Sequence, residues 1–208
     1  MSNPSPAYIA ALEASKEIHK GKQFTGKFLR PHAPFVKEII DRLGCKTVLD
    51  YGCGKGQQYE WVMPNAGTTI EQYWGVSVTK YDPAYEPFAK EPEGKFDLVI
   101  CTQVLSTIPI LDIDWVIARL LWYATKAVYV SERLHDPRKI LGDNALRPKW
   151  TVAEWQKALS GNPEIEKTLA TREIIGGAKI TAHSRSNGSL WEPVAWPEGI
   201  KAMNHTWA

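Results

Sequence analysis

The segment VLDYGCGKG, residues 48–56, constrains this chain more than any other part of its sequence. A short apolar run ends in Asp50 and passes at once into Gly52, Gly54 and Gly56. Such a run, stopped by glycines, is typical of a buried parallel strand. Glycines let a backbone turn approach a ligand with no Cβ in the way, and the free N–H groups of a helix start can bind an anionic group. The segment therefore predicts a strand, a ligand-binding turn and a helix over residues 56–63.

Helix and strand patterns alternate through most of the chain. The predicted helices cover residues 7–19, 34–43 and 113–124, and the predicted strands cover residues 46–51, 74–81, 95–101 and 126–132. Ile9, Leu12 and Ile18 are the expected apolar stripe of the first helix, and Gly44 is the expected cap of the second. Alternation of this kind indicates an α/β fold with a doubly wound, mainly parallel sheet.

The C-terminal part carries other patterns. Thr151 and Glu154 have the spacing of a capping box, which predicts a helix over residues 151–159. Residues 164–174 and 178–186 flank a Gly-Gly turn and predict a closing antiparallel hairpin, so that the sheet ends in an antiparallel strand. Residues 187–208 form an irregular tail, in which three tryptophans are expected to cover core surface.

Length and composition favour one cytoplasmic domain. The 208 residues, 44% hydrophobic and 23% charged, suit a single core with a helical extension over residues 1–33. The start has no basic end followed by an apolar block, and no apolar stretch approaches the roughly 20 residues that span a bilayer. The three cysteines, Cys45, Cys53 and Cys101, lie in apolar runs without C-x-x-C spacing, which argues against a disulfide framework or a metal site.

Three ligands compete for a strand, a glycine turn and a helix: a dinucleotide, a nucleoside triphosphate and S-adenosylmethionine. A dinucleotide fingerprint would need its third glycine at Gln57, where a side chain would separate the helix from the strand. A phosphate-loop match does occur over residues 21–27, but Phe28 stands in place of the metal-binding Ser or Thr, and no strand precedes it. S-adenosylmethionine is left.

The string DYGCGKG resembles the first motif of class I S-adenosylmethionine-dependent methyltransferases, and the resemblance extends over about residues 34–132. It implies that the turn contacts the methionine and ribose parts of the cofactor, and that Asp50 orients the turn and the amino group. The implied contact residues of this turn are Asp50, Tyr51, Gly52, Cys53 and Gly54. The strings LDYGCGKG and YDPAYEPF are also similar to those of phage-encoded methyltransferase-like proteins.

Two further segments match this family less specifically. Asp82 in VTKYDPAY corresponds to an acid that accepts both ribose hydroxyls, and a carboxylate is a natural receptor for a vicinal diol. FDLVICTQVLSTIP resembles the fourth strand and its loop, so that Thr102 and Gln103 would line the cofactor pocket. Only residues 83–95 precede this strand, which implies that strand three is shortened or absent and that Tyr85 or Phe88 supplies the adenine contact.

One departure concerns catalysis. Related proteins often read D-V-L-E-H after strand four, whereas this chain has Ser106 and Thr107 in place of the acid and the histidine, so no general base is predicted there. His135, in the loop after the last central strand, fits a surface histidine better than a catalytic one. Because alignment can supply most of the rate of a methyl displacement, no catalytic side chain is obligatory.

The resemblance implies methyl transfer by in-line displacement to an unidentified acceptor, which could be nucleic acid, protein or a small molecule. A cofactor-cleaving enzyme and a non-catalytic cofactor-binding module are the alternatives, since fold alone does not choose among them. Basic clusters at residues 16–30 and 133–149 could meet a phosphate backbone, although such runs are more often a solvated face. The net charge of +2 does not demand a nucleic-acid partner.

Overall fold

The computed structural model describes residues 3–133, 181–186 and 189–190 of the chain. The helices are α1 (Pro6–His19), α2 (Ala33–Leu43), α3 (Ile70–Trp74) and α4 (Ile113–Tyr123). The strands are β1 (Thr47–Tyr51), β2 (Ser77–Tyr81), β3 (Phe96–Thr102), β4 (Ala124–Arg133), β5 (Thr181–Ser186) and β6 (Ser189–Leu190). No described helix is long and apolar enough to cross a membrane.

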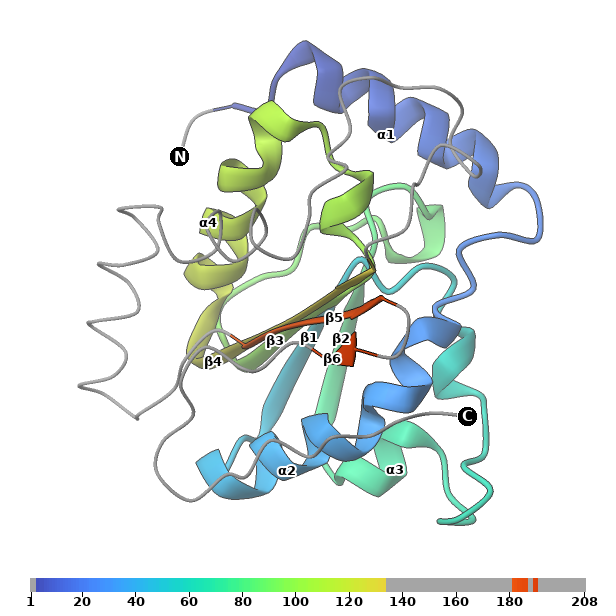
Figure 1. Ribbon diagram of the computed structural model, residues 1–208, viewed down its shortest axis with the longest axis vertical. Coiled ribbons are helices and arrows are strands. Elements are labelled where there is room, and N and C mark those ends of the chain that lie inside the picture. The colour runs from blue at the N-terminus through green and yellow to red at the C-terminus, as the bar shows by residue number, and fades with distance from the viewer. Residues whose placement is uncertain (1–2, 134–180, 187–188, 191–208) are drawn as a thin grey trace.

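One sheet with the strand order β2-β1-β3-β4-β5-β6 organises these elements, as Figure 1 shows. Strands β1 to β5 are parallel to their neighbours, and the two-residue β6 pairs antiparallel with β5. The predicted α/β class with a mainly parallel sheet is confirmed. The first arm of the predicted hairpin, residues 164–174, and the helix predicted over residues 151–159 lie outside the described residues.

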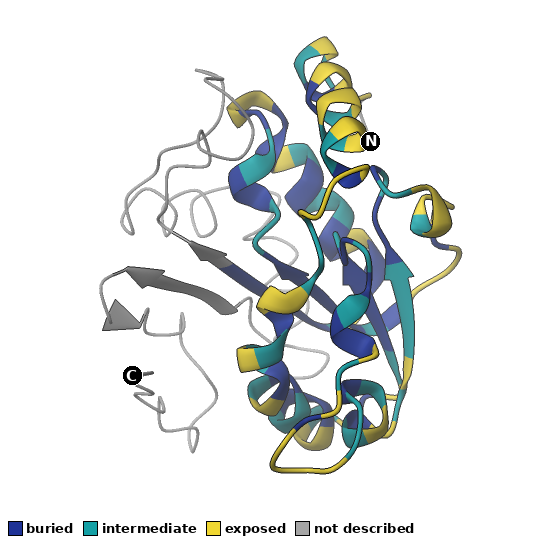
Figure 2. Ribbon diagram, turned by 90° about the vertical axis from the view of Figure 1, so that its right-hand side faces the viewer, coloured by how far each residue is buried: buried dark blue, intermediate teal, exposed yellow. Residues whose placement is uncertain are grey.

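Two apolar cores cover the two faces of the sheet. Because strand side chains alternate between faces, Val48 and Leu98 pack toward α2 and α3, whereas Leu49 and Val99 pack toward α4. In Figure 1 α2 and α3 lie on one side of the strands and α4 on the other. Figure 2 shows the buried strands between helices that are exposed on their outer sides. Cys45, Cys53 and Cys101 all lie in the described part of the chain, where they are buried and form no disulfide.

No strand lies between β2 and β3, as the short connection predicted. Residues 83–95, all of which the structure describes, contain a single 3₁₀ turn, η3 (Glu86–Phe88). Among the described strands, β2 is therefore an edge of the sheet and pairs only with β1. The loop after β2 is free to fold back over the ends of the strands.

The helix expected over residues 56–63 is wrong. A 3₁₀ turn, η2 (Gln57–Tyr59), takes its place, and Val62 then forms an isolated bridge with Thr69. Pro64 follows, and the residue before a proline avoids the helical region, which limits the helix. The strand expected from residue 74 begins instead at Ser77, because a capping box of Thr69 and Gln72 starts the short helix α3 ahead of it.

Helix α1 forms where expected, but its buried stripe agrees only in part with the predicted one, since Leu12 packs against the core and Ile18 is half-buried. Ile9 is 47% exposed, whereas Tyr8, Ala11 and His19 are buried. The Ser5 hydroxyl caps the helix and also donates to Asp112 Oδ2 at 2.6 Å, just before α4. The helix is tied there at its N-terminal end. Its inner side faces a cavity at the strand ends, so burial does not follow hydrophobicity.

Candidate functional site

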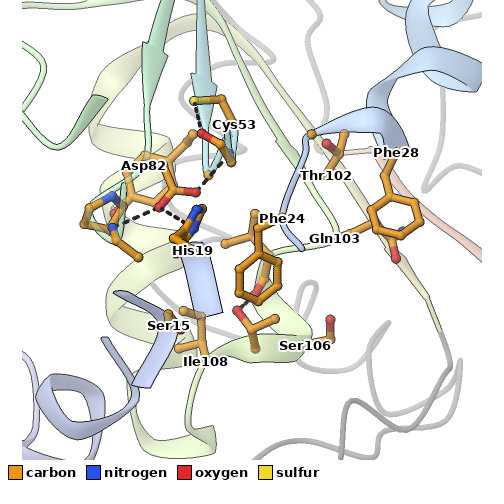
Figure 3. Close-up of a pocket in the computed structure, with 18 of the residues that line it drawn as sticks. Ser15, His19, Phe24, Phe28, Cys53, Asp82, Thr102, Gln103, Ser106 and Ile108 are labelled. Carbon is orange, nitrogen blue, oxygen red and sulfur yellow. Dashed lines mark hydrogen bonds and ion pairs between the residues drawn. The ribbon is translucent and has the colours of Figure 1, made fainter. Parts of the chain in front are cut away.

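A cavity of about 210 Å³ lies at the carboxyl ends of β1, β2 and β3. Open α/β sheets bind ligands at this edge. The glycine turn lies between the segment after β2 and the segment after β3, and α1 and residues 24–28 complete the wall (Figure 3). The residues named from the sequence that line it are Tyr51, Gly52, Cys53, Gly54, Asp82, Thr102 and Gln103.

The glycine turn is held at the end of β2. The N–H groups of Gly52 and Cys53 both donate to the Tyr81 carbonyl, at 2.7 and 3.1 Å. Gly52 has φ +84°, and a Cβ there would lie 2.3 Å from Val104 Cγ2. This position needs glycine because both its backbone angle and its contact with the cavity wall exclude a side chain.

An N-terminal brace, defined as residues 21–26, packs against the same turn. Lys55 N–H donates to the Phe24 carbonyl at 2.8 Å, and Gln57 N–H donates to the Thr25 carbonyl at 3.1 Å. The brace contains most of the phosphate-loop match that the sequence offered. Its backbone receives hydrogen bonds from the glycine turn, which is the opposite of a loop that donates N–H groups to phosphate.

Asp82 is a buried carboxylate at the cavity wall. Gly54 N–H donates to Oδ2 and Ala84 N–H donates to Oδ1, both at 2.9 Å. Burial raises the pKa of Asp82, and these backbone bonds and the nearby His19 act against that rise. A carboxylate has about four lone pairs, so these two bonds leave capacity to accept ligand hydroxyls. Asp82 therefore joins the glycine turn to the cavity.

Asp50 lies behind the turn and does not line the cavity. It is 1% exposed, and its Oδ2 accepts bonds from the Tyr59 hydroxyl at 2.9 Å and from Gln58 Nε2 at 3.1 Å. Burial raises the pKa of Asp50 to about 7. Gln58 Nε2 also reaches the Cys53 carbonyl at 3.2 Å, so Asp50 supports the turn from below through Gln58.

We expect Asp50 to make stability fall as pH rises. Its pKa is about 7 in the folded chain against an ordinary 3.8, so folding favours the protonated carboxyl; this contribution is complete below the unfolded pKa and is lost as pH rises through about 7. Asp50→Asn has no proton to lose, so its stability should fall less between about pH 5 and pH 8. Urea unfolding across this range measures the difference, and parallel pH profiles for the two proteins would contradict it.

The other residues named from the sequence divide between the cavity and its surroundings. Thr102 is the last residue of β3 and Gln103 follows it, and both line the cavity; Gln103 has φ +62°, unusual for a residue with a side chain. Tyr85 and Phe88, the expected adenine contacts, pack against each other at 5.6 Å but are not cavity-lining residues. His135 lies outside the described residues.

Sequence reasoning missed the contribution of α1. Tyr8, Leu12, Ser15 and His19 recur at helical spacing and line the cavity. Two of these side chains, Ser15 and His19, are polar and lie on the inner side of the helix, and that signal was available in the sequence. The sequence pattern predicted α1 as part of an N-terminal extension, whereas in the structure α1 lines one side of the cavity.

Neutral groups occupy the position where the family often has an acid and a histidine. Ser106 and Thr107 lie in the 3₁₀ turn η4 (Leu105–Thr107), and both line the cavity. Thr107 Oγ1 donates to the Val104 carbonyl at 2.7 Å. These hydroxyls can position a ligand, but their ordinary chemistry does not make them general bases at neutral pH.

The comparisons with known proteins agree with this geometry. Residues 15–121 match the family described as "Methyltransferase domain", and this match covers slightly more than half of the chain. Searches among curated proteins and among solved structures gave no match. The matched residues run from the end of α1 to the end of α4 and include β1, β2, β3 and the whole glycine turn. The chain belongs to the class I S-adenosylmethionine-dependent methyltransferase family.

Proposed function

We propose that this chain binds S-adenosylmethionine in the cavity at the strand ends and transfers its methyl group to an acceptor. The observation that carries the proposal is the Asp82 carboxylate, which lines the cavity and is hydrogen-bonded to Gly54 of the glycine turn. The family match supports methyl transfer as the class of reaction.

The cavity residues fit the chemistry of this cofactor. Asp82 retains acceptor capacity for two hydroxyls, and Gly52 keeps the backbone close to the cavity without a side chain. The remaining wall is largely apolar or aromatic, with Leu12 and Ile108 among its members. Such a wall suits a nucleoside with a short aliphatic chain. When bound, S-adenosylmethionine supplies a methyl group already activated on a sulfonium.

The residues that line the cavity then hold the acceptor in line with the methyl group. The segment from Thr102 to Ile108 faces the cavity with amide and hydroxyl groups, which can orient an acceptor. Helix α1 and the N-terminal brace line the opposite side of the cavity. Because displacement at an activated methyl needs alignment above all, this arrangement serves transfer without a general base.

We expect S-adenosylmethionine and S-adenosylhomocysteine to raise the melting temperature, because a ligand that binds only the native state stabilises it by mass action. NADH should leave the melting temperature unchanged, since Gln57 takes the place of the third glycine of a dinucleotide turn. Thermal scans and calorimetry with the three ligands check this. Binding of NADH, with no response to either sulfur compound, would overturn the proposed function.

The products identify the reaction. Incubation with methyl-labelled S-adenosylmethionine and a cell extract should give S-adenosylhomocysteine and a labelled fraction, and separation into nucleic acid, protein and small molecules then finds the acceptor. Cofactor cleavage would give other fragments, and a binding module would give none. Either of these two outcomes would contradict methyl transfer while leaving cofactor binding intact.

A further inference from the structure

His19 is a buried histidine of the cavity for which neither the glycine turn nor the family match assigns a role. It is the last residue of α1, and its side chain is 5% exposed. Figure 3 shows its ring beside the Asp82 carboxylate, with Phe24 nearby. The ring stacks on Tyr85 at 5.3 Å and lies 5.0 Å from the ring of Phe24. Aromatic contacts on two sides fix its orientation.

The two ring nitrogens of His19 have different surroundings. Nε2 lies 3.7 Å from Asp82 Oδ1. Nδ1 is buried and has no hydrogen-bond partner among the described residues. Nδ1 has no exposed surface, so a ligand in the cavity cannot reach it, whereas Nε2 is too far from Asp82 Oδ1 for a hydrogen bond and lies beside a carboxylate that lines the cavity. Nε2 is therefore the ring nitrogen that a ligand group can complete.

We propose that His19 binds the ribose of the cofactor together with Asp82, through Nε2, the ring nitrogen that lies beside this carboxylate. The inference rests on the proposed function. Asp82 can accept hydrogen bonds from the ribose hydroxyls but cannot donate to their oxygens. An imidazole beside it can supply either a donor or an acceptor, so the pair matches a diol better than a carboxylate alone.

Burial favours a neutral His19 ring. Burial lowers the pKa of His19, Asp82 acts in the opposite direction, and Lys55 adds to the lowering. The aromatic side chains of Phe24 and Tyr85 cover the ring. A neutral imidazole has one N–H and one acceptor nitrogen, which is the complement that a hydroxyl requires. Helix α1 would thus be part of the cofactor site.

The test uses His19→Phe in the full chain. Phenylalanine keeps a planar ring against Tyr85 and Phe24 but removes both nitrogens. We expect the affinity for S-adenosylhomocysteine, measured by calorimetry, to fall roughly three- to tenfold, as for one neutral hydrogen bond. The melting temperature without ligand should not fall, since an unpaired buried nitrogen has been replaced by carbon. A purely structural role predicts the reverse: a lower melting temperature and unchanged affinity.

Two conservative variants identify the nitrogen. The amide of asparagine can take the place of Nδ1, whereas the longer glutamine places its amide near Nε2. His19→Gln should therefore recover part of the lost affinity and His19→Asn should recover less. The opposite order would overturn the assignment to Nε2.

His32 gives a matched control, because both of its nitrogens have protein partners. Nδ1 lies 2.7 Å from the Tyr129 hydroxyl and Nε2 lies 3.2 Å from Ser131 Oγ. His32→Phe should lower the melting temperature and leave the affinity for S-adenosylhomocysteine unchanged. An equal loss of affinity in both Phe variants would mean that His19 acts through stability, which would overturn the proposal.

Ribose analogues locate the contact. For either the 2′-deoxy or the 3′-deoxy analogue of S-adenosylhomocysteine, His19→Phe should cause almost no further loss of affinity. Removal of the ribose hydroxyl and removal of the imidazole would then eliminate the same hydrogen bond. A full loss against both analogues would place His19 on another part of the ligand and overturn the ribose contact. If the unaltered protein binds no S-adenosylhomocysteine, the proposed function fails, and this inference fails with it.

Discussion

Gly54→Ala should abolish cofactor binding and lower the melting temperature by roughly 10 °C. Gly54 has φ +60°, and a left-handed angle is unfavourable by about 1–2 kcal/mol for a residue with a Cβ. The added Cβ would lie 2.3 Å from the Phe24 carbonyl oxygen, and forced overpacking adds about 1–3 kcal/mol. Each kcal/mol shifts the melting temperature by about 2–4 °C in a chain of this size. The N-terminal brace must move, and the cavity wall moves with it.

Gly67 provides the matched control. Its φ of +65° is close to that of Gly54, but a Cβ there would meet no atom within 4 Å. Gly67→Ala should therefore lower stability by the backbone strain alone, about 1–2 kcal/mol, and leave calorimetric affinity for S-adenosylhomocysteine unchanged. If the two variants lowered stability equally, the added Cβ at position 54 would have no steric conflict with the N-terminal brace. Native affinity in Gly54→Ala would place the ligand elsewhere.

Asp82→Ala should weaken binding of S-adenosylhomocysteine by about tenfold or more. A hydrogen bond to a charged group contributes about 1.5–3 kcal/mol, and each 1.4 kcal/mol is a factor of ten in affinity. The variant also leaves the N–H groups of Gly54 and Ala84 without their carboxylate, so stability should fall as well. Asp82→Asn keeps one acceptor oxygen and should lose less of both.

Loss of affinity alone would not assign the ribose to Asp82, because the same carboxylate supports the turn through Gly54. The 2′-deoxy analogue separates the two roles. The analogue should bind the unaltered protein more weakly than S-adenosylhomocysteine does. The Asp82→Ala variant should bind the two ligands with similar affinity, because loss of the 2′-hydroxyl and loss of the carboxylate remove the same interaction. If the variant keeps the full preference for ribose, Asp82 serves the turn only.

Local sequence patterns determined the central architecture. Strands β1 and β3 and the turn at Gly52 and Gly54 were predictable, because an apolar run and a glycine act within a few residues of themselves. The position of Asp82 followed, since parallel strands bring their carboxyl ends to one edge of the sheet. The short connection over residues 83–95 likewise excluded a full strand three.

Only the tertiary structure decided what surrounds that turn. Contacts between His19 and Asp82, or between Phe24 and Gly54, join segments about 30 or more residues apart along the chain, and no local pattern encodes such pairing. Asp50 lies only 8 and 9 residues from Gln58 and Tyr59, yet the strand pattern did not decide whether its side chain faces the ligand or the interior. Its hydrogen bonds with these two side chains show that it faces the interior. The sequence by itself determined the strands, the turn and its acid, whereas packing over long chain separations decided that α1 and the brace form the wall of the site.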